Sequence, residues 1–271
     1  MTIRPLVALL ASVILSASSP ARAAGGPPSA GACFLLYEVN VGETRRDPAS
    51  SCELRVTPAS TFKIPHALAA LDAGVVAGPD ARFHYDGRPV PFESWKRDHT
   101  LASAMRYSVV WCFQKLAAAL GPDRERRYLK TFAHGNADPG DDLTSFWLGK
   151  SLLISPEEQM QFLLRLYQDS LPVKREAMRA VREMLVQPPG RVVNAAGEHP
   201  FGDSWPEGTV LGAKTGSATD RSGLEVRWLV GHISRGDRSW IFVGCVTGRA
   251  GLQSDAAIDL AARALHEEGV L

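Results

Sequence analysis

Ser60 and Lys63, three residues apart, are a candidate nucleophile and base. Positions i and i+3 of a helix share one face, so the Lys63 amine can reach the Ser60 hydroxyl if the chain turns helically there. A serine hydroxyl becomes an effective nucleophile only when a nearby base removes its proton. A Ser-x-x-Lys match is expected by chance about once in a chain of this length. The pair therefore needs support from other residues.

Two further motifs follow in the chain. Residues 214–216 read Lys-Thr-Gly and lie in a segment that we predict as a strand, and such a triplet is expected by chance in well under about one chain in ten. Ser108, followed by two valines, opens a predicted helix between the two lysine motifs. A serine at a helix start is also a common N-cap, so a catalytic role and a capping role for Ser108 both stay open.

A Ser-x-x-Lys motif, an internal serine motif and a strand-borne Lys-Thr-Gly, in this order, form the signature of serine β-lactamases and penicillin-binding proteins. Here the Ser-Thr-Phe-Lys, Ser-Val-Val and Lys-Thr-Gly motifs resemble those of the class D (OXA-type, oxacillinase) β-lactamases. The resemblance extends from about Cys33 to the last predicted helix. The supporting residues are Trp111, Gln114, Phe146, Trp147, Leu148 and Arg249.

One position departs from this family. His134 precedes Gly and Asn where the family usually has Tyr-Gly-Asn. We therefore do not assign His134 to the site, and the effect of the replacement is left open.

The resemblance implies a catalytic role for four residues. Ser60 would attack the β-lactam carbonyl, and Lys63, carbamylated by carbon dioxide to N6-carboxylysine, would be the general base in acylation and deacylation. Ser108 would relay a proton to the leaving nitrogen, and Trp147 would donate its indole N–H to the carbamate. Carbamylation requires a neutral amine, and burial lowers the pKa of a lysine. For Trp147, simple core packing is the alternative.

The resemblance also implies a set of residues that bind substrate. Val110 would supply apolar surface near the lysine, and Lys214, Thr215 and Arg249 would hold the substrate carboxylate, for which a guanidinium fork is well suited. Backbone N–H groups of Ser60 and Ser217 would bind the oxyanion. The full set of binding residues is Val110, Lys214, Thr215, Gly216, Ser217 and Arg249. We expect no metal and no bound cofactor, only carbon dioxide or bicarbonate for Lys63.

The N-terminus has the pattern of a secretory signal peptide. Arg4 precedes an apolar run over residues 6–15, and residues 21–23 read Ala-Arg-Ala. The run is far shorter than the roughly 20 apolar residues of a membrane-spanning helix, so we expect no stable membrane anchor. We predict a signal peptide over residues 1–23, a single domain over residues 24–271, and a periplasmic location.

Charge and cysteine content restrict the partners and the compartment. Loss of Arg4 and Arg22 with the signal peptide would change the formal net charge from +1 to −1, which gives no electrostatic reason to expect nucleic acid as a partner. In an oxidising compartment Cys33 and Cys52, which flank a predicted hairpin, either pair or stay free, and both outcomes stay open. Cys112 and Cys245 lie in apolar stretches and are expected to be buried thiols.

The order of elements predicts how these residues are positioned. Strands are expected at residues 33–39, 209–217, 224–233 and 239–247. Helices are expected at 60–74, 101–107, 109–120, 124–132, 155 onward, 173–186 and 255–268, with irregular segments at 75–97 and 134–151. Pro65 lies one turn into the first helix, so we expect that turn to be 3₁₀-like or kinked. The charged run 124–127 is expected to be solvated.

We therefore predict an α/β fold in which an antiparallel sheet is flanked by helices and carries a mostly α-helical insertion, as in serine β-lactamases and penicillin-binding transpeptidases. The sheet part covers about residues 32–74 and 206–271, and the helical part about 75–205. The expected function is hydrolysis of penicillin-type β-lactams, and hence antibiotic resistance. A non-hydrolytic penicillin-binding sensor or a D,D-peptidase with the same fold are the alternatives. Substrate spectrum and oligomeric state stay open.

Overall fold

The computed structural model describes Met1 and residues 31–48, 52–202 and 205–271. The predicted signal peptide, apart from Met1, lies outside these residues. Within them, no helix is both long enough and apolar enough to cross a membrane.

Five antiparallel strands form the central sheet, in the order β2-β1-β9-β8-β7. The strands are β1 (Gly31–Glu38), β2 (Gly42–Asp47), β7 (Val210–Thr219), β8 (Glu225–Arg235) and β9 (Arg238–Gly248). β1 pairs with β9 along its whole length, from Gly31 opposite Thr247 to Glu38 opposite Trp240. The predicted sheet, built from both ends of the chain, is therefore confirmed.

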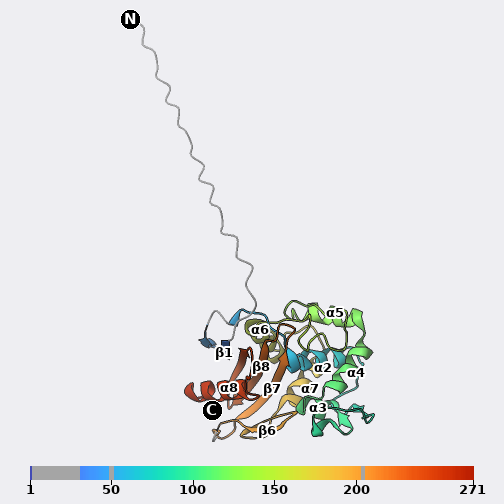
Figure 1. Ribbon diagram of the computed structural model, residues 1–271. Helices are drawn as coiled ribbons and strands as arrows, with labels where there is room; N and C mark the ends of the chain where they lie inside the picture. Colours follow the sequence, from blue (N-terminus) through green and yellow to red (C-terminus); the bar gives the residue numbers. More distant parts are fainter. Residues whose placement is uncertain (2–30, 49–51, 203–204) are drawn as a thin grey trace.

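Alternating side chains give the sheet two apolar faces. On β1, Phe34 and Leu36 belong to one buried cluster, whereas Cys33 and Leu35 belong to the other, as expected from the two-residue period of a strand. The first cluster is covered by the C-terminal helix α8 (Ala256–Glu267), which lies on one side of the sheet in Figure 1.

The other face of the sheet packs against the helical part, which Figure 1 shows on the opposite side from α8. Ser155 and Glu158 form a capping box at the start of one of these helices, and Pro156 occupies its first turn. The helices are α2 (Lys63–Asp72), α3 (Leu101–Arg106), α4 (Val110–Leu120), α5 (Pro122–Thr131), α6 (Pro156–Tyr167) and α7 (Arg175–Leu185).

The segment that carries Ser60 begins with the 3₁₀ turn η1 (Ala59–Phe62), and α2 follows directly from Lys63. Pro65 therefore lies in the first turn of α2, where the backbone N–H groups have no acceptor within the helix. The predicted 3₁₀ turn before Pro65 is confirmed.

Two parts of the sequence prediction were wrong. The segment 191–200, which we placed in the helical part, forms a hairpin. In the run 124–127, Glu125 is 1% exposed, although its arginine neighbours face solvent as expected. The hairpin and the short elements that we did not predict are β3 (Arg82–Phe83), η2 (Glu93–Trp95), β4 (His99–Thr100), β5 (Arg191–Asn194) and β6 (Gly197–Pro200).

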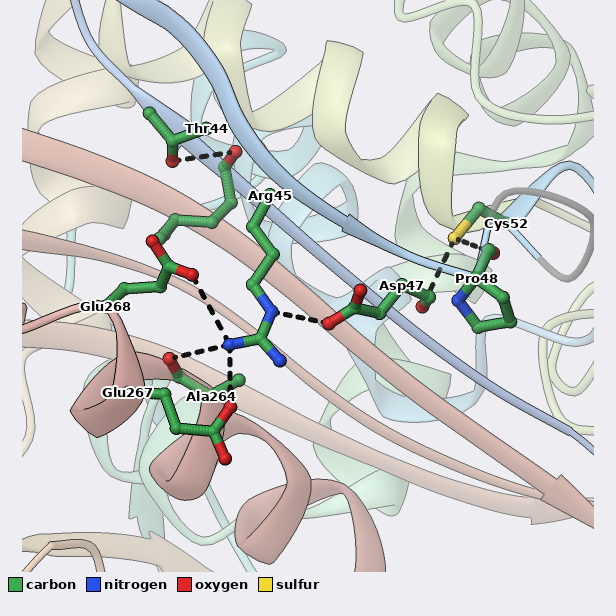
Figure 2. Close-up of polar contacts among 9 residues, drawn as sticks. Thr44, Arg45, Asp47, Pro48, Cys52, Ala264, Glu267 and Glu268 are labelled. Carbon is green, nitrogen blue, oxygen red and sulfur yellow. Dashed lines mark hydrogen bonds and ion pairs between the residues drawn. The ribbon is translucent and has the colours of Figure 1, made fainter.

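Besides the pairing of β1 with β9, side-chain contacts link the β1–β2 hairpin to the rest of the molecule, among them a disulfide and the ion pairs of Arg45. Cys33 and Cys52 form a disulfide, which confirms the pairing, while Cys112 and Cys245 are free and buried. Figure 2 shows the Arg45 guanidinium of β2 between Asp47 and the C-terminal end of α8. There it donates to Glu267 Oε2 at 2.8 Å.

Candidate active site

Ser60 and Lys63 meet as their spacing predicts. The Lys63 Nζ lies 2.8 Å from Ser60 Oγ and donates a hydrogen bond to it. Ala59, directly before the serine, has a φ of 49°, in the left-handed region that costs a non-glycine residue about 1–2 kcal/mol. Such strain persists only where the surrounding structure imposes it, and it is concentrated at functional sites.

The Lys63 side chain is enclosed by apolar and aromatic groups. It is fully buried, and its Nζ lies 5.4 Å from the centre of the Phe113 ring. Burial, together with the nearby charge of Lys214, holds the pKa of Lys63 well below its usual value. The amine is therefore available in its neutral form, which is the nucleophilic and basic form.

Trp147 packs against the segment that carries Lys63, and its indole N–H donor has no acceptor among the described residues. The side chain is fully buried, and its Nε1 makes no hydrogen bond within the part of the chain that the structure describes. Its ring packs against Phe62 and His66 at centroid distances of 5.7 and 5.3 Å. A buried N–H without an acceptor costs about 1–3 kcal/mol, so this site suits an added acceptor group on Lys63.

Thr57, which we did not predict, holds the Trp147 loop against the segment before Ser60. Its hydroxyl donates to the Trp147 carbonyl at 3.0 Å and accepts from the Gly149 N–H at 2.9 Å. Its carbonyl accepts from the Trp228 indole at 2.9 Å, which ties both segments to β8. A lone threonine before a motif carries no sequence signal for this role.

Ser108 faces the second lysine. Lys214 Nζ donates to Ser108 Oγ at 2.9 Å and to the Thr215 carbonyl at 3.0 Å. Burial lowers the pKa of Lys214 to about 7. Val109 occupies the N-cap position of α4 and Ser108 lies before it with a φ of 56°, so the capping interpretation of Ser108 is wrong.

The β7 edge supplies the opposite wall. The carbonyls of Leu211 and Ala213 accept hydrogen bonds from Gln187 on the side away from β8. Because backbone groups two residues apart in a strand point the same way, the Ser217 N–H also faces away from β8. A Cβ on Gly216 would lie 3.0 Å from the Pro58 carbonyl, which is tighter than nearly all real Cβ contacts, so a larger residue would require β7 or η1 to shift.

An open cleft of about 850 Å³ lies between these elements. Ser60, Ser108, Val110 and residues 215–217 line it, together with Leu148 and with residues that we did not predict, among them Phe92, Trp95 and Asn194. The last comes from the β5–β6 hairpin. Arg249 is not among the lining residues. It is exposed on the bend after β9, where its charge acts on Asp220 and helps to lower the pKa of that carboxyl.

Two histidines lie behind the Lys63 pocket rather than in the cleft. Burial lowers the pKa of His134 to about 3, and its ring nitrogens have no hydrogen-bond partner in the described chain. His66 is buried and lies 2.7 Å from Glu125.

The comparisons agree on one family. Residues 37–266 match the penicillin-binding protein transpeptidase domain. The probable β-lactamase YbxI of Bacillus subtilis is 34% identical over 84% of this chain and 78% of its own length. β-Lactamase OXA-2 of Salmonella typhimurium is 44% identical, but its match covers 54% of this chain and only 52% of that protein.

Solved structures give the same picture. Class D β-lactamase BAT-2 superimposes with a TM-score of 0.77 and 33% identity over 89% of this chain and 93% of its own. The C-terminal domain of the Bacillus licheniformis BlaR penicillin receptor has a TM-score of 0.78 and 29% identity over 90% of this chain and 92% of its own. Both are similar to this chain over nearly the whole fold, so fold similarity alone does not separate hydrolysis from sensing.

Proposed function

The chain belongs to the class D β-lactamases, within the penicillin-binding transpeptidase family, and we propose that it hydrolyses β-lactams through an acyl-enzyme on Ser60. The observation that carries the proposal is the fully buried Lys63 amine, 2.8 Å from the Ser60 hydroxyl at the base of the cleft. Proton removal by a neighbouring base is what makes a serine nucleophilic, and this pair has the required contact.

Lys63 is proposed to carry a carbamate. Two features of the chain fit this group: the neutral state that burial favours for the Lys63 amine, and the Trp147 indole N–H, which lacks an acceptor in the described residues. When present, the carbamate would supply a carboxylate-like base that removes the Ser60 proton and later activates the deacylating water. Trp147 would hold it by donating a hydrogen bond.

Binding of the reacting carbonyl is assigned to two backbone donors. The Ser217 N–H faces away from β8, and the Ser60 N–H lies in the first turn of η1, where the helical ladder offers no acceptor. Donors placed where charge develops stabilise the transition state without needing to reorganise. The close approach of Gly216 to Pro58 brings the two segments together.

Ser108 and Lys214 are proposed to deliver the proton to the leaving nitrogen. Their 2.9 Å hydrogen bond, and the Lys214 pKa of about 7, suit a group that gives up and regains a proton near neutral pH. Val110, Lys214, Thr215 and Gly216 would form the substrate wall. Arg249 stays a predicted ligand of the substrate carboxylate, although its exposed position on the bend after β9 leaves it outside the cleft lining.

The proposal is tested with Ser60→Ala. We expect this variant to bind β-lactams without forming a covalent adduct and to lose turnover, as measured by intact-protein mass spectrometry and by hydrolysis of a chromogenic cephalosporin. A covalent penicilloyl adduct on Ser60→Ala would overturn the assignment of the nucleophile.

The similarity to the BlaR receptor domain gives sensing as a second candidate. Burst and steady-state kinetics on the wild-type protein separate the two. One equivalent of product without further turnover would favour a sensor, whereas continued hydrolysis supports the enzyme. Turnover of a D-alanyl-D-alanine peptide would indicate a peptidase.

The proposed location is the periplasm. The Cys33–Cys52 disulfide supports this proposal, because disulfides persist in oxidising compartments. Fractionation of the producing cells and N-terminal sequencing of the mature protein test it.

A further inference from the structure

A buried His–Glu pair lies behind the Lys63 pocket and has no part in the steps proposed above. His66 Nε2 is 2.7 Å from Glu125 Oε1, and the two side chains are 0% and 2% exposed. The two atoms are at ion-pair distance but are not aligned as a hydrogen bond. A buried ionisable pair is weak evidence for stability, because desolvation offsets any attraction between the two groups, so another role is worth considering.

His66 forms part of the wall around Lys63. The two residues are three positions apart on α2, which places their Cβ atoms about 5–6 Å apart on one face of the helix. Both approach the Phe113 ring, His66 with a centroid distance of 5.8 Å. The His66 ring also packs edge-on against Trp147. The imidazole is therefore next to the space in which a group on Lys63 would meet the Trp147 donor.

On its other side the pair borders a small crevice between α2 and α5. The crevice has a volume of about 170 Å³, and its lining includes Pro65, His66, Glu125 and Tyr128. It shares no lining residue with the substrate cleft. The pair, although almost fully buried, therefore borders a hollow that is separate from the substrate cleft.

Carbamate formation releases a proton. When the neutral Nζ attacks carbon dioxide, an N–C bond forms, one electron pair of a C=O bond moves to oxygen, and one N–H bond breaks. Nothing is oxidised or reduced, but the proton must leave a pocket from which water is excluded. An imidazole can accept it on Nδ1, and a carboxylate beside Nε2 stabilises the imidazolium and orients the ring.

We propose that the His66–Glu125 pair takes up the proton released when Lys63 captures carbon dioxide, and so sets how readily the carbamate forms. This inference rests on the modified lysine of the proposed function. His66 is a positioning residue here, since it acts on Lys63 and does not touch the substrate.

The other titratable groups around Lys63 are poor acceptors. Burial raises the pKa of the Cys112 thiol on α4 to about 12, and burial with the Asp72 hydrogen bond raises that of Tyr128 on α5 to about 12, so both stay protonated at neutral pH. His134, whose ring packs against Phe62, has its pKa lowered by burial to about 3 and resists protonation. The Lys214 amine, whether charged or neutral, is already hydrogen-bonded to Ser108.

The test measures the carbamate itself. Wild type, His66→Asn and Glu125→Gln are titrated with carbon-13 bicarbonate at neutral pH, and the carbamate signal is followed by NMR. His84→Asn is the matched control, because His84 forms an exposed pair with Asp98 outside the Lys63 pocket. We expect His66→Asn to need on the order of tenfold more bicarbonate for half occupancy, Glu125→Gln to shift in the same direction, and His84→Asn to match wild type.

Thermal unfolding of each variant separates this role from a purely structural one. A lower melting temperature with an unchanged bicarbonate requirement in both pair variants would overturn the inference and leave a structural ion pair. If His66→Asn does not fold, the test rests on Glu125→Gln. A bicarbonate titration curve of Glu125→Gln that matches wild type would overturn the inference. If the wild-type protein hydrolyses substrate but gives no carbamate signal, the proposed modification of Lys63 is wrong, and so is this inference. The proposed acyl-enzyme on Ser60 would not be affected by that result.

Discussion

At the scale of single residues, a substitution of Trp147 tests the carbamate proposed on Lys63 most directly. Trp147→Phe keeps an aromatic ring in the pocket but removes the indole N–H, the donor that has no acceptor among the described residues. A hydrogen bond to a charged group contributes about 1.5–3 kcal/mol, so we expect a bicarbonate requirement roughly 10- to 100-fold higher. Carbon-13 NMR and bicarbonate-dependent hydrolysis measure it.

Trp240→Phe is the control for this substitution, because Trp240 is buried in the cluster under α8, on the other face of the sheet. A Trp147→Phe enzyme with the bicarbonate requirement of wild type would show that the indole N–H does not hold the carbamate.

Burial of His134 should make the free energy of unfolding fall as the pH is lowered. Its pKa is about 3 in the folded protein, where burial disfavours the charged ring, against about 6.5 when unfolded. Between these values the unfolded chain binds the additional proton, so stability falls as the pH falls, by at most about 1.4 kcal/mol per pH unit. We expect His134→Phe, which fills the aromatic contacts to Phe62 and Phe162 without a titrating ring, to lose less stability on acidification.

Urea unfolding at neutral pH and at about pH 5 checks this. Wild type should lose on the order of 2 kcal/mol more than His134→Phe over that interval. Equal losses in the two proteins would mean that His134 is protonated in the folded state.

Residue types and spacing were enough to select Ser60, Lys63, Ser108 and Lys214 as candidates, because each belongs to a short motif with a chemical reason for its spacing, and the structure places them in two hydrogen-bonded pairs. Thr57 and Glu125 could not be found in this way. Their partners, Trp147 and His66, lie 90 and 59 positions away in the chain, and such contacts exist only after the elements pack.

At the scale of elements, the contact between β7 and η1 sets the distance between the two segments that carry the proposed oxyanion donors. We expect Gly216→Ala to lower kcat/KM by on the order of 10- to 100-fold, because the added methyl group would meet the Pro58 carbonyl, Thr61 and Trp228 at 3.0–3.1 Å and push the strand away from the nucleophile. Steady-state kinetics measures the loss, and unfolding checks that the fold is kept.

Gly248→Ala on β9 is the matched control. A Cβ there meets only the Leu252 side chain at 3.6 Å or more, which is ordinary contact. Equal effects of the two substitutions would show that strand flexibility, rather than the approach to η1, is what glycine supplies.

Periodicity also determined which elements could be predicted. The long strands and helices have clear two-residue or helical patterns of apolar side chains, and they were predicted to within a few residues. β5 and β6 are four residues each and follow Pro188 and Pro189, so that segment has too short a pattern to distinguish a hairpin from a loop. Gln187 stabilises the hairpin by accepting from the Val193 N–H and donating to the Ala213 carbonyl, contacts that no local pattern reveals.

At the scale of the whole molecule, the disulfide and the Arg45 ion pairs that link the β1–β2 hairpin to other elements should differ in strength. A disulfide that closes a loop of this size, with its cysteines 19 positions apart, stabilises a protein by about 3 kcal/mol in the chain-entropy description. The Arg45 contacts with Glu267 and Glu268 are partly exposed ion pairs, which contribute about 0–1 kcal/mol.

We therefore expect the double variant Cys33→Ala and Cys52→Ala to lose about 3 kcal/mol in urea unfolding and Arg45→Ala less than about 1 kcal/mol, with both folded enzymes retaining hydrolysis. A larger loss for Arg45→Ala than for the double variant would contradict this ranking.

The pairing of β1 with β9 also has a consequence for biosynthesis. Gly31 accepts a hydrogen bond from Thr247, 216 positions later, so the first strand has no central partner until nearly the whole chain exists. Ribosomes add about 5–20 residues per second, which leaves β1 without that partner for roughly 10–40 s. Topologies with such distant contacts fold slowly. The nascent chain thus passes through a long interval in which its first apolar strand is open to chaperones and to translocation in an unfolded state.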